Sequence, residues 1–299
     1  MARRSRLREF RSSLLASALR AVGAVGRRIS LARARRWGAR VGRLAWRVVP
    51  RERRKALRSL ALAFPDRPEA EREAIARAMF AHLGISLFEI AWLPNLTPRL
   101  LEATTRFEGL EHLRGAAESG RGVVLFTGHC GNWEWMAAAI ALAGFRMNVI
   151  ARDLDVDRIN DFVVASRAQF GVDTIGRGSS ASARDILRTL RSGAILGVLI
   201  DQNIRAESIP VEFFGIPAST PIGPARLAIR SGALAIAGFI EREPGGTLVV
   251  RFQRPIDTSP STDPAGLTAQ MTRAIEAQIR RVPAQWVWMH QRWKERTRR

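Results

Sequence analysis

Residues 123–134 constrain the fold of this chain more than any other stretch. Residues 123–126, Val-Val-Leu-Phe, form an apolar run of the length of a buried strand. A turn with two glycines follows, and residues 132–143 have the pattern of a helix that begins at an asparagine cap and ends before Gly144. The stretch therefore predicts a strand, a tight turn and a helix in direct succession.

The alternation of strands and helices continues toward the C-terminus. Strands are expected at 123–127, 146–151, 172–175, 194–201, 233–241 and 247–253, and helices at 132–143, 156–170, 182–192, 223–231 and from 263 onward. This order is typical of an α/β fold with a mostly parallel central sheet flanked by helices. Residues 203–221 are expected to form a long loop.

Two further segments precede this α/β part. Residues 51–105 have a helical pattern, and residues 1–50 are strongly basic. We therefore expect a basic segment 1–50, a helical region 51–105 and an α/β core 106–299. The hydrophobic content of 46% is sufficient for a substantial core.

The net charge of +21 is concentrated at the two ends of the chain. Residues 1–60 carry 19 basic and 2 acidic side chains, and residues 280–299 carry 7 and 1. Residues 61–279 are nearly balanced, with 22 basic and 24 acidic side chains. A basic excess confined to the ends favours an anionic partner surface and leaves the central part an ordinary domain.

The segment 1–50 is amphipathic. At about 100° per residue, four apolar side chains fall on one stripe and four arginines on a stripe beside it, namely Trp37, Val41, Leu44 and Val48, and Arg36, Arg40, Arg43 and Arg47. Arginines interrupt every apolar run before the ~18 residues that would cross a bilayer. We expect this segment to lie in the interface of an anionic membrane; the alternative is a helix packed on the core with its arginines in water.

His129 and Glu134 form the candidate catalytic pair. Open α/β sheets place their sites beyond the C-terminal ends of the strands, which is where His129 lies. Glu134 lies in the first turn of the next helix, and we expect it to hold one ring nitrogen of His129 and leave the other free as a base. In the alternative interpretation, Glu134 is only a favourable charge at a helix N-terminus and His129 a satisfied turn residue.

Other polar residues have simpler interpretations. One cysteine and four scattered histidines allow no internal disulfide and show no metal-ligand spacing, so no metal site and no cofactor are expected. Cys130 is interpreted as a buried thiol rather than a nucleophile, and His82 as a packing residue. Trp286, Trp288 and Trp293, with the nearby His290, form either a membrane-facing aromatic cluster or part of the core.

The segment Thr127-Gly-His-Cys-Gly-Asn-Trp-Glu134 resembles the His-x4-Asp/Glu box of glycerolipid-type acyltransferases. Its surroundings are most similar to those of the late acyltransferases of lipid A biosynthesis, and the related phosphatidylinositol mannoside acyltransferases share the box. Further similar segments occur in the same order along the chain: Leu57–Pro65, Arg152 with Asn160 and Arg167, Asp201-Gln202, Val211–Gly215, Ala218–Pro221 and Gln285–Lys294.

The resemblance implies an acyltransferase in which His129 removes a proton from an acceptor hydroxyl that attacks an acyl thioester. It implies His129 and Glu134 as catalytic residues and six residues near the substrates, namely Gly131, Asn132, Arg152, Arg167, Asp201 and Gln202. Backbone amides of the turn 128–132, or a nearby arginine, would stabilise the oxyanion. The donor would be acyl carrier protein or acyl-CoA.

The resemblance further implies a glycolipid acceptor at the cytoplasmic face of the inner membrane, with the protein peripheral or shallowly anchored in anionic membrane lipid. A lipid A precursor is the first choice, and a phosphatidylinositol mannoside, another glycolipid or a lysophospholipid is the alternative. A thioesterase would use the same turn with water as acceptor. A non-enzymatic basic protein that binds membranes or nucleic acid is the remaining hypothesis, although no nucleic-acid motif occurs and no nucleic-acid partner is expected.

Overall fold

The computed structural model describes residues 28–151, 157–176, 180–204 and 206–293. Its centre is a seven-stranded sheet with the order β1-β9-β8-β2-β5-β3-β4. The strands are β1 (Thr105–Glu108), β2 (Val123–Thr127), β3 (Met147–Ala151), β4 (Asp173–Gly176), β5 (Ile195–Leu199), β8 (Leu234–Arg242) and β9 (Leu248–Phe252). All neighbouring pairs are parallel except β8 and β9. The predicted α/β fold with a mostly parallel sheet is confirmed.

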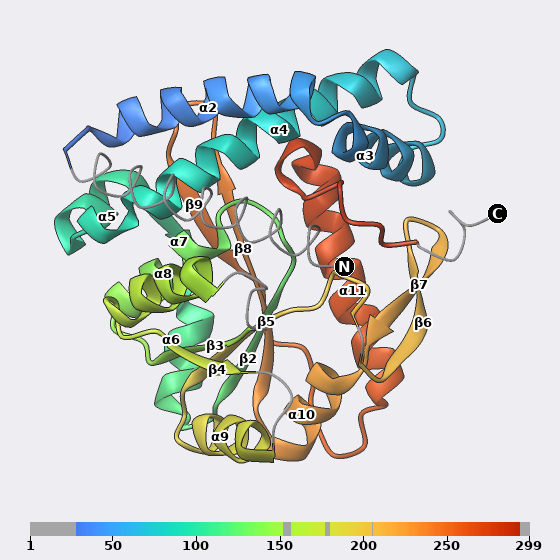
Figure 1. The fold of residues 1–299 in the computed structure, drawn as a ribbon. Coiled ribbons are helices and arrows are strands. Elements are labelled where there is room, and N and C mark those ends of the chain that lie inside the picture. The colour runs from blue at the N-terminus through green and yellow to red at the C-terminus, as the bar shows by residue number, and fades with distance from the viewer. Residues whose placement is uncertain (1–27, 152–156, 177–179, 205, 294–299) are drawn as a thin grey trace, which may run out of the picture.

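Helices cover both faces of the sheet (Figure 1). One face packs against α5 (Pro98–Thr104), α6 (Leu110–Glu118) and α7 (Trp133–Leu142), with α8 (Asp157–Ala168) beside α7. The other face packs against α9 (Ser180–Arg191), α10 (Gly223–Ser231) and α11 (Pro264–Arg281). Because β2 lies between these layers, all five of its side chains are buried, which explains its uninterrupted apolar sequence.

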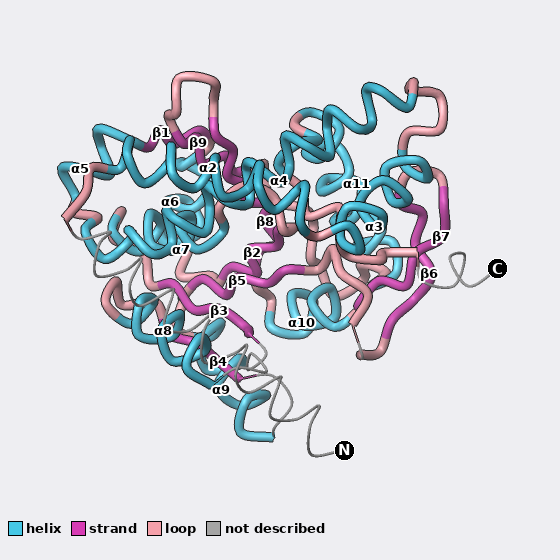
Figure 2. Tube along the Cα trace, turned by 45° about the horizontal axis from the view of Figure 1, so that its top comes forward, coloured by secondary structure: helices cyan, strands magenta, loops and turns pink. Residues whose placement is uncertain are grey.

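A two-stranded hairpin lies outside the row of sheet strands and contacts α11 (Figure 2). It consists of β6 (Ser208–Phe213) and β7 (Ile216–Pro221), paired antiparallel from Phe213 and Ile216 at the turn. The expectation of a loop over residues 203–221 is wrong for most of this stretch. Alternating burial along β6 and β7 and the left-handed conformations of Phe214 and Gly215 make the hairpin.

Three helices occupy most of residues 31–92: α2 (Leu31–Val48), α3 (Pro50–Ala63) and α4 (Glu69–Trp92). Figure 1 shows α2 lying lengthwise on α4. The two backbones approach closely at glycines, because a Cβ on Gly42 would lie 2.1 Å from the carbonyl oxygen of Phe80. Likewise, a Cβ on Gly84 would lie 2.2 Å from the carbonyl oxygen of Gly38. Helix α2 is therefore seated on α4 by a face of small residues.

The apolar stripe of α2 points away from α4. Trp37, Val41, Leu44 and Val48 are 54%, 41%, 55% and 62% exposed. The buried face of α2 is instead formed by Ala34, Gly38, Gly42 and Trp46. Helix α2 is thus packed on the core, as the alternative expected, but through another face than the predicted stripe, which stays exposed. Residues 1–27 of the same basic segment lie outside the described residues.

Helix α4 continues into a short 3-10 turn, Leu93–Asn95. In the described part of the chain, residues Glu69–Asn95 form one helix that is long and apolar enough to cross a membrane, judged by length and composition only. Of its most apolar window, 44% is buried within the protein, and α4 packs against α2, α3 and α7.

The C-terminal tryptophans belong to the core. Trp286, Trp288 and Trp293 are 1%, 0% and 3% exposed, and all three contact the aromatic rings of the β6–β7 hairpin. The membrane-facing interpretation of this cluster is wrong, and the core interpretation is confirmed.

Candidate active site

The candidate site lies where β2 and its parallel neighbour β5 end. The two strands pair residue by residue up to Thr127 and Leu199, so the segments after them leave the sheet at the same edge. His129 follows β2, and Asp201 follows β5. The register therefore brings together two side chains that lie 72 residues apart in the chain.

Asp201 holds the imidazole of His129. Nδ1 of His129 lies 2.7 Å from Oδ1 of Asp201, and the backbone N–H of His129 donates to Oδ2 at 2.7 Å. The indole N–H of Trp286 donates to the same Oδ2 at 2.7 Å. The two rings of His129 and Trp133 also meet edge to face, with centroids 4.9 Å apart. The imidazole is thus fixed from two sides.

The protonation of Asp201 decides the tautomer of His129. Burial opposes ionisation of this carboxyl, but the attraction of His129 and the hydrogen bonds from His129 and Trp286 outweigh burial and lower the pKa of Asp201 to about 2. Asp201 is therefore a carboxylate at neutral pH and can only accept hydrogen bonds. Consequently Nδ1 of His129 carries a hydrogen, and in the neutral imidazole Nε2 is the nitrogen with the lone pair, as a general base requires.

Glu134 binds Arg167 rather than His129. Nε of Arg167 donates to Oε2 of Glu134 at 2.8 Å, and Nη2 donates to Oε1 at 2.5 Å. Both carboxylate oxygens thus face α8, while Nδ1 of His129 is bonded to Asp201. The expectation that Glu134 orients His129 is wrong. Proximity in sequence favoured Glu134, but the first turn of α7 directs this side chain to the neighbouring helix.

Gly131 and Asn132 complete the turn between β2 and α7. Gly131 has a φ of +66°, and a Cβ there would lie 2.0 Å from the carbonyl oxygen of Ile240. Only glycine fits at this position, because the backbone of Ile240 lies so close. Asn132 is 1% exposed, and its Oδ1 accepts a hydrogen bond from the backbone N–H of Trp135 at 3.1 Å. The predicted asparagine cap of α7 is confirmed.

Three backbone amides of the turn are already bonded. The N–H groups of His129, Cys130 and Gly131 donate to Asp201, Gly128 and Gln285 respectively. They are therefore not free to bind an oxyanion in this conformation. The amides of Trp133 and Glu134, the first two residues of α7, find no hydrogen-bond acceptor among the described residues. Such amides at a helix N-terminus favour negative charge.

The remaining predicted residues divide into three cases. Arg167 reaches the site through its ion pair with Glu134 and is mostly buried. Gln202 lies beside Asp201 and is half-buried. Arg152 lies outside the described residues. Cys130 is confirmed as a buried thiol, because it is 2% exposed and burial, with the nearby charge of Asp201, raises the pKa of its thiol.

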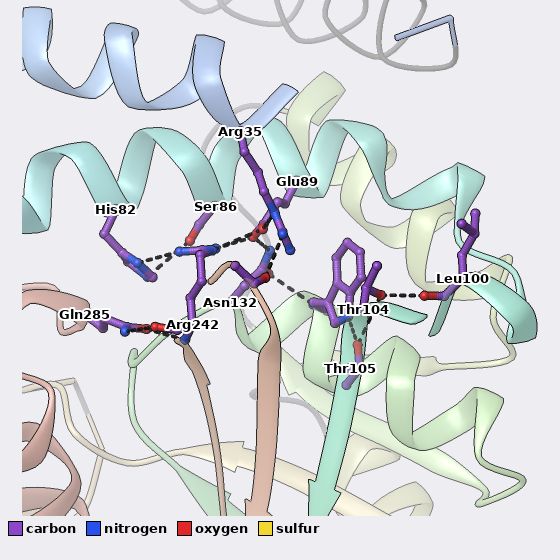
Figure 3. Close-up of polar contacts among 12 residues, drawn as sticks. Arg35, His82, Ser86, Glu89, Leu100, Thr104, Thr105, Asn132, Arg242 and Gln285 are labelled. Atoms are coloured by element: carbon purple, nitrogen blue, oxygen red, sulfur yellow. Dashed lines mark hydrogen bonds and ion pairs between the residues drawn. The ribbon is translucent and has the colours of Figure 1, made fainter. Parts of the chain in front are cut away.

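Sequence reasoning missed a buried polar cluster behind the turn (Figure 3). Glu89 of α4 is 0% exposed and accepts hydrogen bonds from Arg35, Arg242 and Asn132. The signal was present in the sequence, because Glu89 is the only acidic residue in the apolar run 85–92. A carboxylate within a buried helix needs compensating partners.

His82 belongs to the same cluster. Its Nδ1 accepts a hydrogen bond from Nη1 of Arg242 at 2.7 Å, because a guanidinium can only donate. Its Nε2 lies 3.3 Å from Oγ of Ser86. Burial, followed by the charge of Arg242, lowers the pKa of His82 to about 3, so the ring is neutral. The interpretation of His82 as a packing residue agrees with these contacts.

The fold and the site define an α/β enzyme with a carboxylate-held histidine at the C-terminal edge of a parallel sheet. The bacterial lipid A biosynthesis acyltransferase family matches residues 2–295 of the chain. The chain belongs to this family and is an acyltransferase.

Individual relatives agree with this assignment. The chain is 27% identical over 267 residues to the lipid A biosynthesis lauroyltransferase of Escherichia coli K12, a match covering 87% of this chain and 85% of the relative. It is 28% identical over 264 residues to the palmitoleoyltransferase of lipid A biosynthesis from the same organism, covering 87% and 84%. It is also 25% identical over 231 residues to a phosphatidylinositol mannoside acyltransferase of Mycobacterium tuberculosis, covering 76% and 72%.

Proposed function

We propose that this acyltransferase moves a fatty acyl chain from an acyl thioester to a hydroxyl group of a glycolipid, with His129 as the general base. The observation that carries the proposal is the hydrogen bond of 2.7 Å between His129 Nδ1 and the ionised Asp201, which selects the tautomer of the neutral ring whose lone pair is on Nε2. Asp201 thus takes the orienting role that the sequence suggested for Glu134.

In the proposed reaction, Nε2 of His129 accepts the proton of the acceptor hydroxyl while its oxygen attacks the thioester carbonyl carbon. The tetrahedral oxyanion that forms collapses, the carbon–sulfur bond breaks, and the imidazolium returns the proton to the departing thiolate. Asp201 stabilises the imidazolium between the two steps. The free amides of Trp133 and Glu134 at the start of α7 are the oxyanion donors we propose, in place of the bonded turn amides.

Glu134 and Arg167 have a different proposed role. Their bidentate ion pair ties the first turn of α7 to α8. It therefore holds the two helix amides in place beside the base. Gly131, Asn132, Gln202 and Arg152 remain proposed substrate-side residues.

The acceptor class is proposed from the named relatives. Two of them act in lipid A biosynthesis and one is a phosphatidylinositol mannoside acyltransferase. We therefore propose a lipid A precursor as first acceptor and a phosphatidylinositol mannoside or another glycolipid as second. Acyl carrier protein or acyl-CoA supplies the acyl chain, and no cofactor is required by the reaction as written.

We propose that the protein works at the cytoplasmic face of the inner membrane. The exposed apolar stripe of α2 is bordered by arginines, and a groove beside it is lined by Arg43, Arg47, Arg53 and Arg77 around Trp46. An apolar face flanked by guanidinium groups suits the interface of an anionic bilayer. This arrangement supports a peripheral or shallow attachment through α2.

The test uses purified protein with vesicles that contain anionic phospholipid and one candidate acceptor. Radiolabelled acyl carrier protein thioester and acyl-CoA are offered separately. Label appearing in the glycolipid, and lost with His129→Ala, supports the proposal. Label released as free fatty acid at the same rate with and without acceptor would contradict it and would indicate a thioesterase.

A further inference from the structure

Glu89 is a fully buried carboxylate with three partners from distant parts of the chain. Nε of Arg35, in α2, donates to its Oε1 at 2.6 Å, and Arg242, at the end of β8, donates to both oxygens. The amide Nδ2 of Asn132 donates to Oε2 at 3.0 Å. Figure 3 shows the three donors converging on the carboxylate from different elements.

Asn132 connects this carboxylate to the active-site turn. Its two amide atoms have separate tasks, because Oδ1 caps α7 at the Trp135 N–H while Nδ2 donates to Glu89. The bond to Glu89 therefore sets which way the amide faces. If the amide turned over, the nitrogen would point at the Trp135 N–H, and the cap would be lost.

Arg242 reaches the same turn by a second route. The backbone N–H and C=O of Arg242 bond the side-chain amide of Gln285, at 2.9 Å and 2.8 Å. The backbone oxygen of Gln285 accepts the N–H of Gly131 at 2.9 Å. Glu89 and the Gln285 segment thus hold two consecutive residues of the turn that carries His129.

Arg35 connects Glu89 to α2, a helix at the surface of the molecule. It belongs to α2, whose apolar stripe is exposed on another face of the helix. Besides Glu89, it donates to the carbonyl oxygen of Gly246 at 2.7 Å. The contact of Arg35 with Glu89 exists only while α2 is seated on α4.

We propose that Glu89 is a positioning residue for acyl transfer, because through Asn132 it fixes the turn that carries His129. Through Arg35, Glu89 also makes the conformation of this turn depend on the packing of α2 against α4. The inference rests on the proposed function of His129. In the competing account, Glu89 only neutralises two buried arginines and affects stability alone.

Glu241 provides a matched control. It is 5% exposed and binds two arginines, Arg251 and Arg281, together with the side-chain amide of Gln278. Its environment thus repeats that of Glu89, with two guanidinium groups and one carboxamide. None of its partners belongs to the active-site turn. Glu241→Gln therefore reproduces the loss of a buried charge without the connection to Asn132.

The experiment compares Glu89→Gln with Glu241→Gln in the vesicle assay. We expect Glu89→Gln to lower kcat by about 10- to 100-fold, since a small displacement of a catalytic group has that effect, with the KM for the acyl donor unchanged. Glu241→Gln should keep the wild-type kcat per folded molecule, whatever its loss of stability. Equal kcat losses in both variants, or no loss in Glu89→Gln, would overturn the inference.

Two further measurements isolate the route through Asn132. In a double-mutant cycle, Glu89→Gln should add no further loss of kcat to Asn132→Ala; additive losses would overturn that route. Hydrogen exchange should be faster in the segment 128–136 of Glu89→Gln and unchanged there in Glu241→Gln. Unchanged exchange in both would also contradict the inference.

The hydrogen-exchange measurement does not depend on acyl transfer. It therefore tests the positioning role of Glu89 separately from the proposed function of His129. Absence of transfer by the wild-type protein would defeat the proposed function and leave the exchange comparison valid. If Glu89→Gln fails to fold, Arg35→Gln takes its place, because Glu89 then keeps Arg242. We expect a smaller loss of kcat and faster exchange in the same segment, and wild-type values of both would overturn the inference.

Discussion

Asp201 accepts three hydrogen bonds, two from His129 and one from Trp286. Its substitution by asparagine keeps the shape but removes the charge that stabilises the imidazolium. We predict that Asp201→Asn lowers kcat by about 10²–10⁴-fold, the range of general-base catalysis. The vesicle assay with radiolabelled acyl thioester measures this loss.

Glu134→Gln is the comparison for this prediction. It leaves the His129–Asp201 pair intact and removes only the charge opposite Arg167. Its loss of kcat should therefore be smaller than that of Asp201→Asn. An equal or larger loss of kcat in Glu134→Gln would contradict the assignment of the orienting carboxylate.

The lowered pKa of His82 predicts that the stability of the protein depends on pH. Its pKa is about 3 in the folded protein against 6.5 for the ordinary side chain, so below pH 6.5 the unfolded chain binds a proton that the folded chain does not. The free energy of unfolding should therefore fall by up to about 1.4 kcal/mol per pH unit as the pH drops from 6.5 toward 3. Urea unfolding at several pH values measures this slope.

His82→Gln should flatten that slope between pH 6.5 and 4, with His112→Gln as the control for removing a histidine. The lowered pKa of Asp201 adds its own loss only below pH 3.8, as the pH falls toward 2. An unchanged slope in His82→Gln would contradict a neutral, buried His82.

Among single residues, the sequence predicted the position of His129 at the end of β2 but not the carboxylate that holds its ring. His129, Gly131 and Asn132 lie in one local pattern of strand, turn and helix, which short-range propensities determine. The choice between Glu134 and Asp201 depends on which strand lies next to β2, and the pairing of β2 with β5 is a tertiary feature. Glu89 was missed for the same reason, because its partners come from α2, α7 and β8.

Among the helices and strands, α2 and α4 approach each other closely at glycines. We predict that Gly42→Ala destabilises the protein by about 1–3 kcal/mol, because the added methyl would overlap the backbone of α4 at Phe80. Gly115→Ala in α6 is the matched control, since nothing lies within 4 Å of a Cβ there.

The control should be neutral or stabilising by up to ~1 kcal/mol through helix propensity. Thermal unfolding measures the change in stability of both variants. Equal effects of Gly42→Ala and Gly115→Ala would contradict the packing of α2 on α4.

Element prediction succeeded where periodicity was strong. Strand β2 and helix α10 have the predicted bounds, and the other predicted strands occur with ends displaced by one or two residues. Strand β1 and helix α6 were missed. Strand β1 is difficult to recognise because it has only four residues, and not all of them are buried. The hairpin β6–β7 was missed because its prolines suggested a loop, whereas edge strands tolerate proline.

In the whole molecule, the candidate active-site turn and the exposed apolar stripe of α2 are connected through Glu89, which bonds Asn132 of the turn and Arg35 of α2. We predict that Leu44→Ser weakens binding to anionic vesicles by about tenfold or more, because a buried leucine contributes roughly 1.5–3 kcal/mol. Leu100→Ser removes a leucine that is 37% exposed on α5, away from the stripe, and is the control.

Vesicle co-sedimentation measures both variants. Equal losses from Leu44→Ser and Leu100→Ser would contradict a membrane-binding role of the α2 stripe. Binding should also weaken as salt increases, because the arginines beside the stripe contribute through their charge.

At the scale of the molecule, composition and patterning predicted the fold class and the concentration of charge at the ends. They did not determine the environment of the C-terminal tryptophans. An aromatic cluster beside basic residues fits a membrane interface as well as a core, and only the packing of the hairpin against these rings decides between them.

The most direct test of acyl transfer by His129 is mass spectrometry of the lipids from cells that lack this protein, complemented with the wild type or with His129→Ala. We predict that one glycolipid class lacks a single acyl chain and that only the wild-type protein restores it. An identical lipid profile with and without the protein, or full restoration by His129→Ala, would contradict the account.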